Sequence, residues 1–158
     1  MAKRRFVMLG VAVVVALVLG GCGWFGPTFE STNITGTGGN GTWTFASGYA
    51  VATGDEWSIK LYPVEPNGGV DPWTIGAYDS IEDSIFFIAP ATGEPIKLKL
   101  LGDGAQTVTY FVNGTNYILT SGWVQVSVNT TDLVATVQLD VWSGDISFNG
   151  TSQVPLAP

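Results

Sequence analysis

The fold is decided by the stretch Val124-Gln-Val-Ser-Val-Asn-Thr-Thr-Asp-Leu-Val-Ala-Thr-Val-Gln-Leu-Asp-Val-Trp-Ser-Gly-Asp-Ile-Ser-Phe148. Apolar and polar residues alternate within it, and a period of two is typical of β-strands with one buried face. A four-residue loop at 129–132 is expected to pair Val128 with Leu133, and a two-residue loop at 143–144 to pair Val141 with Ile146. These registers place the apolar side chains on one face. The sequence therefore predicts three adjacent antiparallel strands.

The same pattern extends upstream. Apolar residues alternate with polar ones over 57–61 and 96–100, and the alternation turns Lys97 and Lys99 toward water. Residues 85–89 are continuously apolar, which is typical of a central strand covered on both faces. The segment 108–112 leads into the hairpin dipeptide Asn113-Gly114 and a further strand at 117–119. We predict an all-β fold, an antiparallel β-sandwich of about eight or nine strands, with a small β-barrel as the alternative.

Composition narrows the possible functions. The chain has 158 residues, of which 46% are hydrophobic and 12% are charged, enough for one domain with a core. It has no histidine and one cysteine, which excludes imidazole bases, Ser-His and Cys-His nucleophile pairs, and histidine-ligated zinc. We predict that the protein is not an enzyme, assign no catalytic residue and expect no cofactor.

The first residues are typical of an export signal. Lys3, Arg4 and Arg5 precede an apolar run over 6–19, and the run ends at Leu19-Gly20-Gly21-Cys22. Such a run is shorter than the roughly 20 residues that a spanning helix needs, which favours a cleaved signal helix over the alternative of a permanent membrane helix.

The motif Leu19-Gly20-Gly21-Cys22 resembles the lipobox of bacterial lipoproteins. The resemblance implies that residues 1–21 are a signal peptide and that Cys22 becomes the lipidated first residue of the mature chain. It further implies a short tether over 22–29, a β-sandwich domain over 30–158, and placement in the bacterial envelope. Gly23 after the cysteine favours the outer membrane or cell surface. Several acyl chains would make this anchor stable. Arg4-Arg5-Phe6 also partly resembles a twin-arginine signal.

A second, shorter resemblance concerns the end of the chain. The hairpin over 142–150 is similar to the closing strands of uncharacterised envelope lipoproteins that fold as β-sandwiches.

The charge balance bears on possible partners. Three cations and all thirteen acidic residues lie beyond Cys22, which gives that part a net charge of −10. Because a phosphate backbone repels such a surface, we exclude nucleic acid as a partner.

One candidate ligand site lies on the outward face of the closing hairpins. The expected registers place Trp142 beside Asp145, Asp140 beside Ser147, Gln138 beside Asn149, and Trp123 opposite Gln138. Aromatic rings among planar polar groups suit sugars, since the rings stack on apolar sugar faces while amides and carboxylates bind hydroxyls. The alternative is that these tryptophans only cover neighbouring strands. The candidate ligand-binding residues are Trp123, Gln138, Asp140, Trp142 and Asn149.

Two weaker patterns remain. Loop carboxylates are hard ligands suited to calcium, and the candidates are Asp71, Asp79, Glu82 and Asp83. Five N-x-S/T sequons, at Asn33, Asn40, Asn113, Asn129 and Asn149, permit glycosylation; the three that read Asn-Gly-Thr are also typical of turns.

We predict a lipid-anchored, non-enzymatic structural or interaction module whose partner is an envelope protein or a glycan, with a carbohydrate- or small-ligand-binding module as the alternative.

Overall fold

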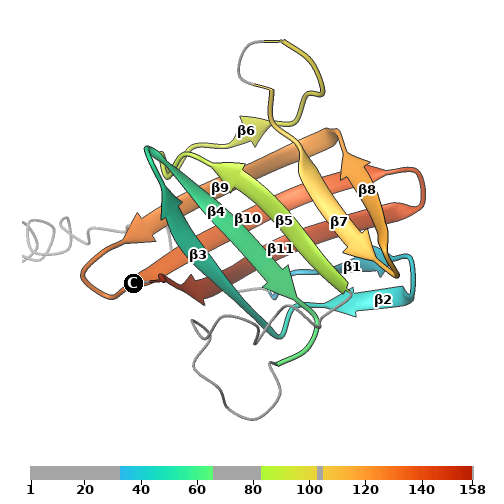
Figure 1. Ribbon diagram of the computed structural model, residues 1–158, viewed down its shortest axis with the longest axis horizontal. Helices are drawn as coiled ribbons and strands as arrows, with labels where there is room; N and C mark the ends of the chain where they lie inside the picture. The colour runs from blue at the N-terminus through green and yellow to red at the C-terminus, as the bar shows by residue number, and fades with distance from the viewer. Residues whose placement is uncertain (1–32, 66–82, 103–104, 158) are drawn as a thin grey trace, which may run out of the picture.

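The structure is a computed structural model that describes residues 33–65, 83–102 and 105–157 (Figure 1). The described residues form eleven strands and no helix, and the strands pair into two antiparallel sheets. The predicted all-β sandwich is confirmed, because the strand ladders form two separate sheets rather than one closed barrel. Within the described ranges, no helix has the length and apolar character needed to cross a membrane.

The six-stranded sheet has the order β2-β1-β11-β10-β9-β6. Its strands are β1 (Thr35–Gly38), β2 (Gly41–Thr44), β6 (Ile96–Lys97), β9 (Ser121–Asn129), β10 (Val134–Ser143) and β11 (Ile146–Pro155). The five-stranded sheet has the order β3-β4-β5-β7-β8. Its strands are β3 (Ser47–Thr53), β4 (Glu56–Tyr62), β5 (Asp83–Ala89), β7 (Val108–Val112) and β8 (Thr115–Leu119).

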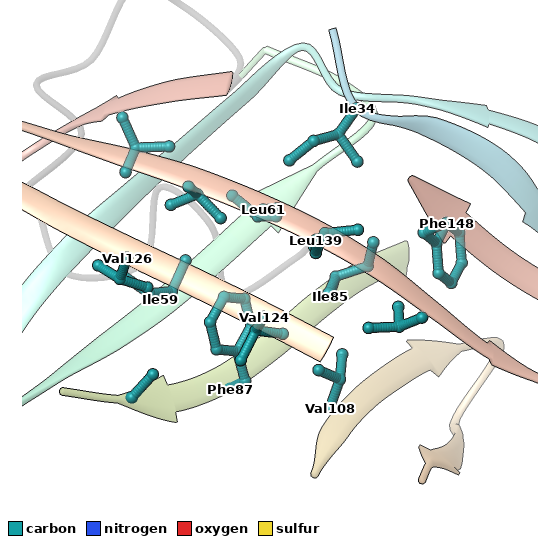
Figure 2. Packing of buried hydrophobic residues seen from close by; sticks show 14 of the residues in the cluster. Ile34, Ile59, Leu61, Ile85, Phe87, Val108, Val124, Val126, Leu139 and Phe148 are labelled. Atoms are coloured by element: carbon teal, nitrogen blue, oxygen red, sulfur yellow. The ribbon is translucent and has the colours of Figure 1, made fainter. Parts of the chain in front are cut away.

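The core lies between the two sheets, whose strands cross at an angle in Figure 1. Val124, Val126 and Leu139 of the six-stranded sheet face Ile59 and Phe87 of the five-stranded sheet (Figure 2). All five side chains are at most 1% exposed. This burial is the main favourable term in the folding of the domain.

The β9–β10 pairing keeps the predicted inward face but not the predicted register. Val128 lies opposite Ala135 rather than Leu133, so the strands are shifted by two residues. Asn129 explains the shift, because its side-chain oxygen accepts the N–H groups of Thr131 and Asp132 and extends β9 by one residue. Leu133 then lies in the turn at φ 54°, with 62% of its surface exposed. A shift of two preserves which face each residue occupies.

The β10–β11 hairpin shows the same kind of difference. Val141 pairs with Phe148 rather than Ile146, and the two-residue loop is Gly144-Asp145 rather than 143–144. Gly144 takes a φ of 59°, a left-handed value that a glycine reaches without a steric cost.

Two upstream predictions need correction. The strand predicted over 96–100 is limited to β6, because Lys99 pairs with Gln106 instead of β9 and leaves Leu100 and Leu101 exposed. The central strand β5 is covered on its inner face alone; Phe86 is partly buried and Ile88 is 36% exposed on the outer face. A two-layer sandwich leaves one face of each sheet outward, whatever the residues there.

The three Asn-Gly-Thr segments are not all turns. Asn113 and Gly114 form the predicted two-residue turn between β7 and β8, with φ values of 50° and 75°. Gly41 follows the turn between β1 and β2. Asn149-Gly150 instead lies inside β11, where a Cβ on Gly150 would come within 2.8 Å of the Ile34 Cα. Close approach of the β1 segment, rather than a turn, requires this glycine.

Candidate functional site

A row of polar and aromatic residues crosses the outward face of the six-stranded sheet. Direct strand partners define it: Lys97 with Trp123, Trp123 with Asp140, and Asp140 with Asn149. Thr35 and Thr44 continue the row across β1 and β2. With neighbouring strands ~4.8 Å apart, the six residues span about 24 Å. We call this set, Lys97, Trp123, Asp140, Asn149, Thr35 and Thr44, the cross-strand row.

The register shift changes the neighbours of the predicted site residues. Trp123 lies opposite Asp140 rather than Gln138, and Asp140 lies opposite Asn149 rather than Ser147. Trp123, Asp140 and Asn149 are therefore immediate neighbours on three adjacent strands, a closer grouping than the predicted register gives.

The other two predicted residues lie on either side of this row. Gln138 is paired with Gln125 and Thr151, and Trp142 is paired with Ser121 and Ser147 rather than Asp145. All five predicted residues thus share the outward face. Trp142 is 46% exposed and Asp140 and Asn149 are exposed, whereas Trp123 is partly buried.

The strand side chains on this face are uncharged apart from Lys97 and Asp140. Hydroxyl and amide groups flank the two tryptophans on neighbouring strands, including Ser147, Asn149 and Gln138. These groups donate and accept hydrogen bonds, and an indole ring offers an apolar surface beside them. The arrangement suits a ligand with many hydroxyls and little charge.

A second cluster joins the two sheets at one end of the sandwich, and its centre is Asp83. The Trp43 indole Nε1 donates to the Asp83 carboxylate at 3.0 Å, and the Tyr110 hydroxyl and Asn40 amide also hydrogen-bond that carboxylate. The Tyr110 hydroxyl in turn accepts the Gly39 N–H at 3.2 Å. We call Trp43, Asp83 and Tyr110 the Asp83 cluster.

Burial perturbs both acidic groups of the Asp83 cluster. Desolvation raises the pKa of Asp83 above 3.8, although the hydrogen bonds from Tyr110, Trp43 and Asn40 oppose the shift. Desolvation, together with the negative charge of Asp83, raises the pKa of Tyr110 to about 12. The cluster is a lone carboxylate held by neutral donors, an arrangement that connects β2, β5 and β7. Trp43 and Tyr110 were not predicted as site residues, because no local spacing in the sequence indicates them.

Most of the residues in the calcium prediction, and all of those in the lipid-anchor prediction, are not described by the structure. Asp71, Asp79, Glu82, Cys22, the signal peptide and the tether all lie outside the described residues. Asp83 opens β5 and is committed to the Asp83 cluster. Among the described residues, no group of three or more His, Cys, Asp or Glu side chains is placed to hold a metal ion.

A scan against family models, a search of curated proteins and a search of solved structures each returned no match to this chain.

Proposed function

We propose that the chain is a non-enzymatic interaction module of the bacterial cell envelope, held at the outer membrane or cell surface by lipid on Cys22. The basic start, the short apolar run and Leu19-Gly20-Gly21-Cys22 support the anchor. Growth with labelled fatty acid tests it. The label should enter the wild-type protein, and Cys22→Ser should abolish labelling; a wild-type N-terminus that is uncut and bare would contradict the anchor.

The observation that carries the interaction role is the exposure of the cross-strand row and of Trp142 beside it. A face that served packing alone would be covered by another element, yet Asp140 and Asn149 are exposed and Trp142 keeps nearly half of its surface in contact with solvent. Exposed aromatic groups that lie beside polar groups mark binding surfaces.

For the ligand, we propose a neutral glycan. The pairing of Trp123, Asp140 and Asn149 as direct partners on adjacent strands supports this class, because one sugar ring could stack on the indole while its hydroxyls reach the carboxylate and the amide. The net charge of −7 disfavours an anionic polysaccharide. An uncharged polymer meets no such repulsion.

Tryptophan fluorescence during titration with neutral polysaccharides tests the glycan proposal. Trp123→Ala and Trp142→Ala should each weaken binding about tenfold or more, equivalent to ~1.4 kcal/mol. Phe86→Ala is the matched control, because Phe86 is an aromatic residue on the outward face of the other sheet and should leave binding unchanged. If wild-type fluorescence does not respond to any neutral polysaccharide, the glycan proposal is wrong.

A further inference from the structure

The inference concerns the edges of the two sheets, where strands leave backbone groups without a strand partner. There are four edge strands in the part of the chain described: β2 and β6 in the six-stranded sheet, and β3 and β8 in the five-stranded sheet. An edge strand can pair with another chain unless it is short, charged, interrupted by proline or covered.

Three of these edges are protected. Strand β2 has four residues, and β6 has two, with Pro95 before it and Lys97 at its end. Strand β3 is covered by the chain end, because the Ala157 N–H donates to the Ala50 carbonyl at 2.7 Å and Leu156 forms a bridge with Ala50. Each protection is one of the known ways in which proteins avoid edge pairing.

Within the described ranges, strand β8 has none of these protections. It has five residues, Thr115–Leu119, with neither charge nor proline, and the first four are exposed. Tyr117 is 40% exposed and Ile118 44% exposed. No charged residue occurs between 105 and 131, although the chain as a whole carries a net charge of −7. Electrostatic repulsion therefore does not protect this edge.

The turn before β8 determines which of its backbone groups are free. Asn113 and Gly114 both have positive φ values, and in such a two-residue hairpin the flanking pair, Val112 and Thr115, exchanges hydrogen bonds. Hydrogen-bonded and non-hydrogen-bonded pairs alternate along an antiparallel ladder, so Tyr117 and Leu119 also bond to β7. The N–H and C=O groups of Asn116 and Ile118 then point to the open side.

We infer that β8 pairs antiparallel with β8 of a second copy of this chain, about a two-fold axis at Tyr117. In this register Asn116 of each copy lies opposite Ile118 of the other, and both pairs exchange hydrogen bonds. The two five-stranded sheets become one continuous sheet. Because the pairing consumes the one unprotected edge among the strands described and β3 is covered, assembly stops at two copies.

The oligomeric state of the full chain in detergent tests the proposal, with sedimentation as the measurement. The wild type should sediment as a dimer, and Ile118→Lys should halve the sedimenting protein mass. Ile88→Lys is the matched control. Ile88 is an isoleucine on the same outward face with similar exposure, but it lies on the central strand β5 and should leave the dimer intact.

A cross-link identifies the register. Tyr117→Cys places two thiols at the two-fold axis, in a non-hydrogen-bonded pair with Cα atoms ~4.5 Å apart, within the range for a disulfide. Oxidation should yield a covalent dimer, and the wild type, whose one cysteine is Cys22, should not. A monomeric wild type overturns the proposal. So does loss of the dimer in both lysine variants, which would indicate association through the sheet face instead.

Discussion

The two sheets bury similar apolar side chains against each other, but their outward faces differ. The six-stranded sheet turns outward the cross-strand row together with Gln138 and Trp142, a face of hydroxyls, amides and two tryptophans. The five-stranded sheet turns out Phe86, Ile88, Phe111 and Ile118, and the ammonium group of Lys60 lies 6.0 Å from the centroid of the Phe86 ring. The two inward faces together form the hydrophobic core, whereas the outward faces are suited to different partners.

This difference shows that the fold restricts the inward-facing residues more than the outward-facing ones. Residues that face the core are restricted to apolar side chains of fitting volume. Residues that face outward are restricted by solubility and by binding, so a polar face on one sheet and an apolar face on the other indicate two kinds of surface. We propose a glycan for the first and a second copy of the chain at the β8 edge of the second.

The largest expected effect comes from a substitution near the start of β9 that disrupts its pairing with β10 in the six-stranded sheet. Gly122 has a φ of 100°, and a Cβ there would lie 2.9 Å from the Val141 Cα and even closer to the Asp140 carbonyl oxygen. These are backbone atoms of β10 and cannot move aside alone. Gly122→Ala should destabilise the protein by ~4 kcal/mol or prevent folding, measured by urea unfolding.

Gly54→Ala is the control for this prediction. Gly54 also has a positive φ, 64°, but a Cβ there meets nothing within 4 Å. Its substitution should cost only the backbone strain, about 1–2 kcal/mol. Equal losses in the two variants would show that backbone strain, and not the crowding against β10, limits Gly122.

A pair of phenylalanines measures how much the inward and outward faces differ. Phe148 of the six-stranded sheet is fully buried, with its ring centroid 5.4 Å from that of Trp43 and 4.9 Å from that of Tyr110. Phe86 is partly buried on the outward face of the five-stranded sheet. Phe148→Ala should cost ~3–5 kcal/mol and Phe86→Ala about 1 kcal/mol in denaturant unfolding. A similar cost for both would mean that the outward apolar face is covered.

The sequence was sufficient to predict which face the residues of β9, of β10 and of the start of β11 occupy, because hydrophobic alternation fixes the face. It did not fix the register, because a shift of two residues leaves the alternation unchanged. Local turn chemistry decides between these registers: Asn129 binds the following amides, and Leu133 adopts a left-handed φ that its side chain does not favour. The shared outward face of Trp123, Gln138, Asp140, Trp142 and Asn149 was therefore predicted, but their cross-strand neighbours were not.

Two other features were beyond prediction for different reasons. The β1–β2 hairpin is short and rich in glycine, so its sequence shows almost no alternation of apolar and polar residues from which strands could be predicted. The Asp83 cluster joins residues from separate strands, and Trp43 is 40 positions away from the carboxylate that it binds. Contacts of this kind depend on how the two sheets pack, which no local pattern encodes.

The smallest expected effect concerns the contact between the sheets at the Asp83 cluster. Because burial raises the pKa of Asp83 in the folded state, folding favours the neutral carboxyl over the charged one. The contribution of Asp83 to stability is therefore fully present below its usual pKa of 3.8 and is lost as the pH rises through the raised value. Asp83→Asn keeps an oxygen acceptor for the Trp43 indole and the Tyr110 hydroxyl but does not titrate.

Free energies of unfolding at several pH values, from about pH 3 to about pH 7, test this expectation. The stability of the wild type relative to Asp83→Asn should fall as the pH rises, because the wild type alone acquires a half-buried charge. A relative stability that rises over the same range would mean that the hydrogen bonds to the carboxylate outweigh its desolvation. Asp140→Asn, on the exposed face of the other sheet, is the control, and its stability relative to the wild type should change little with pH.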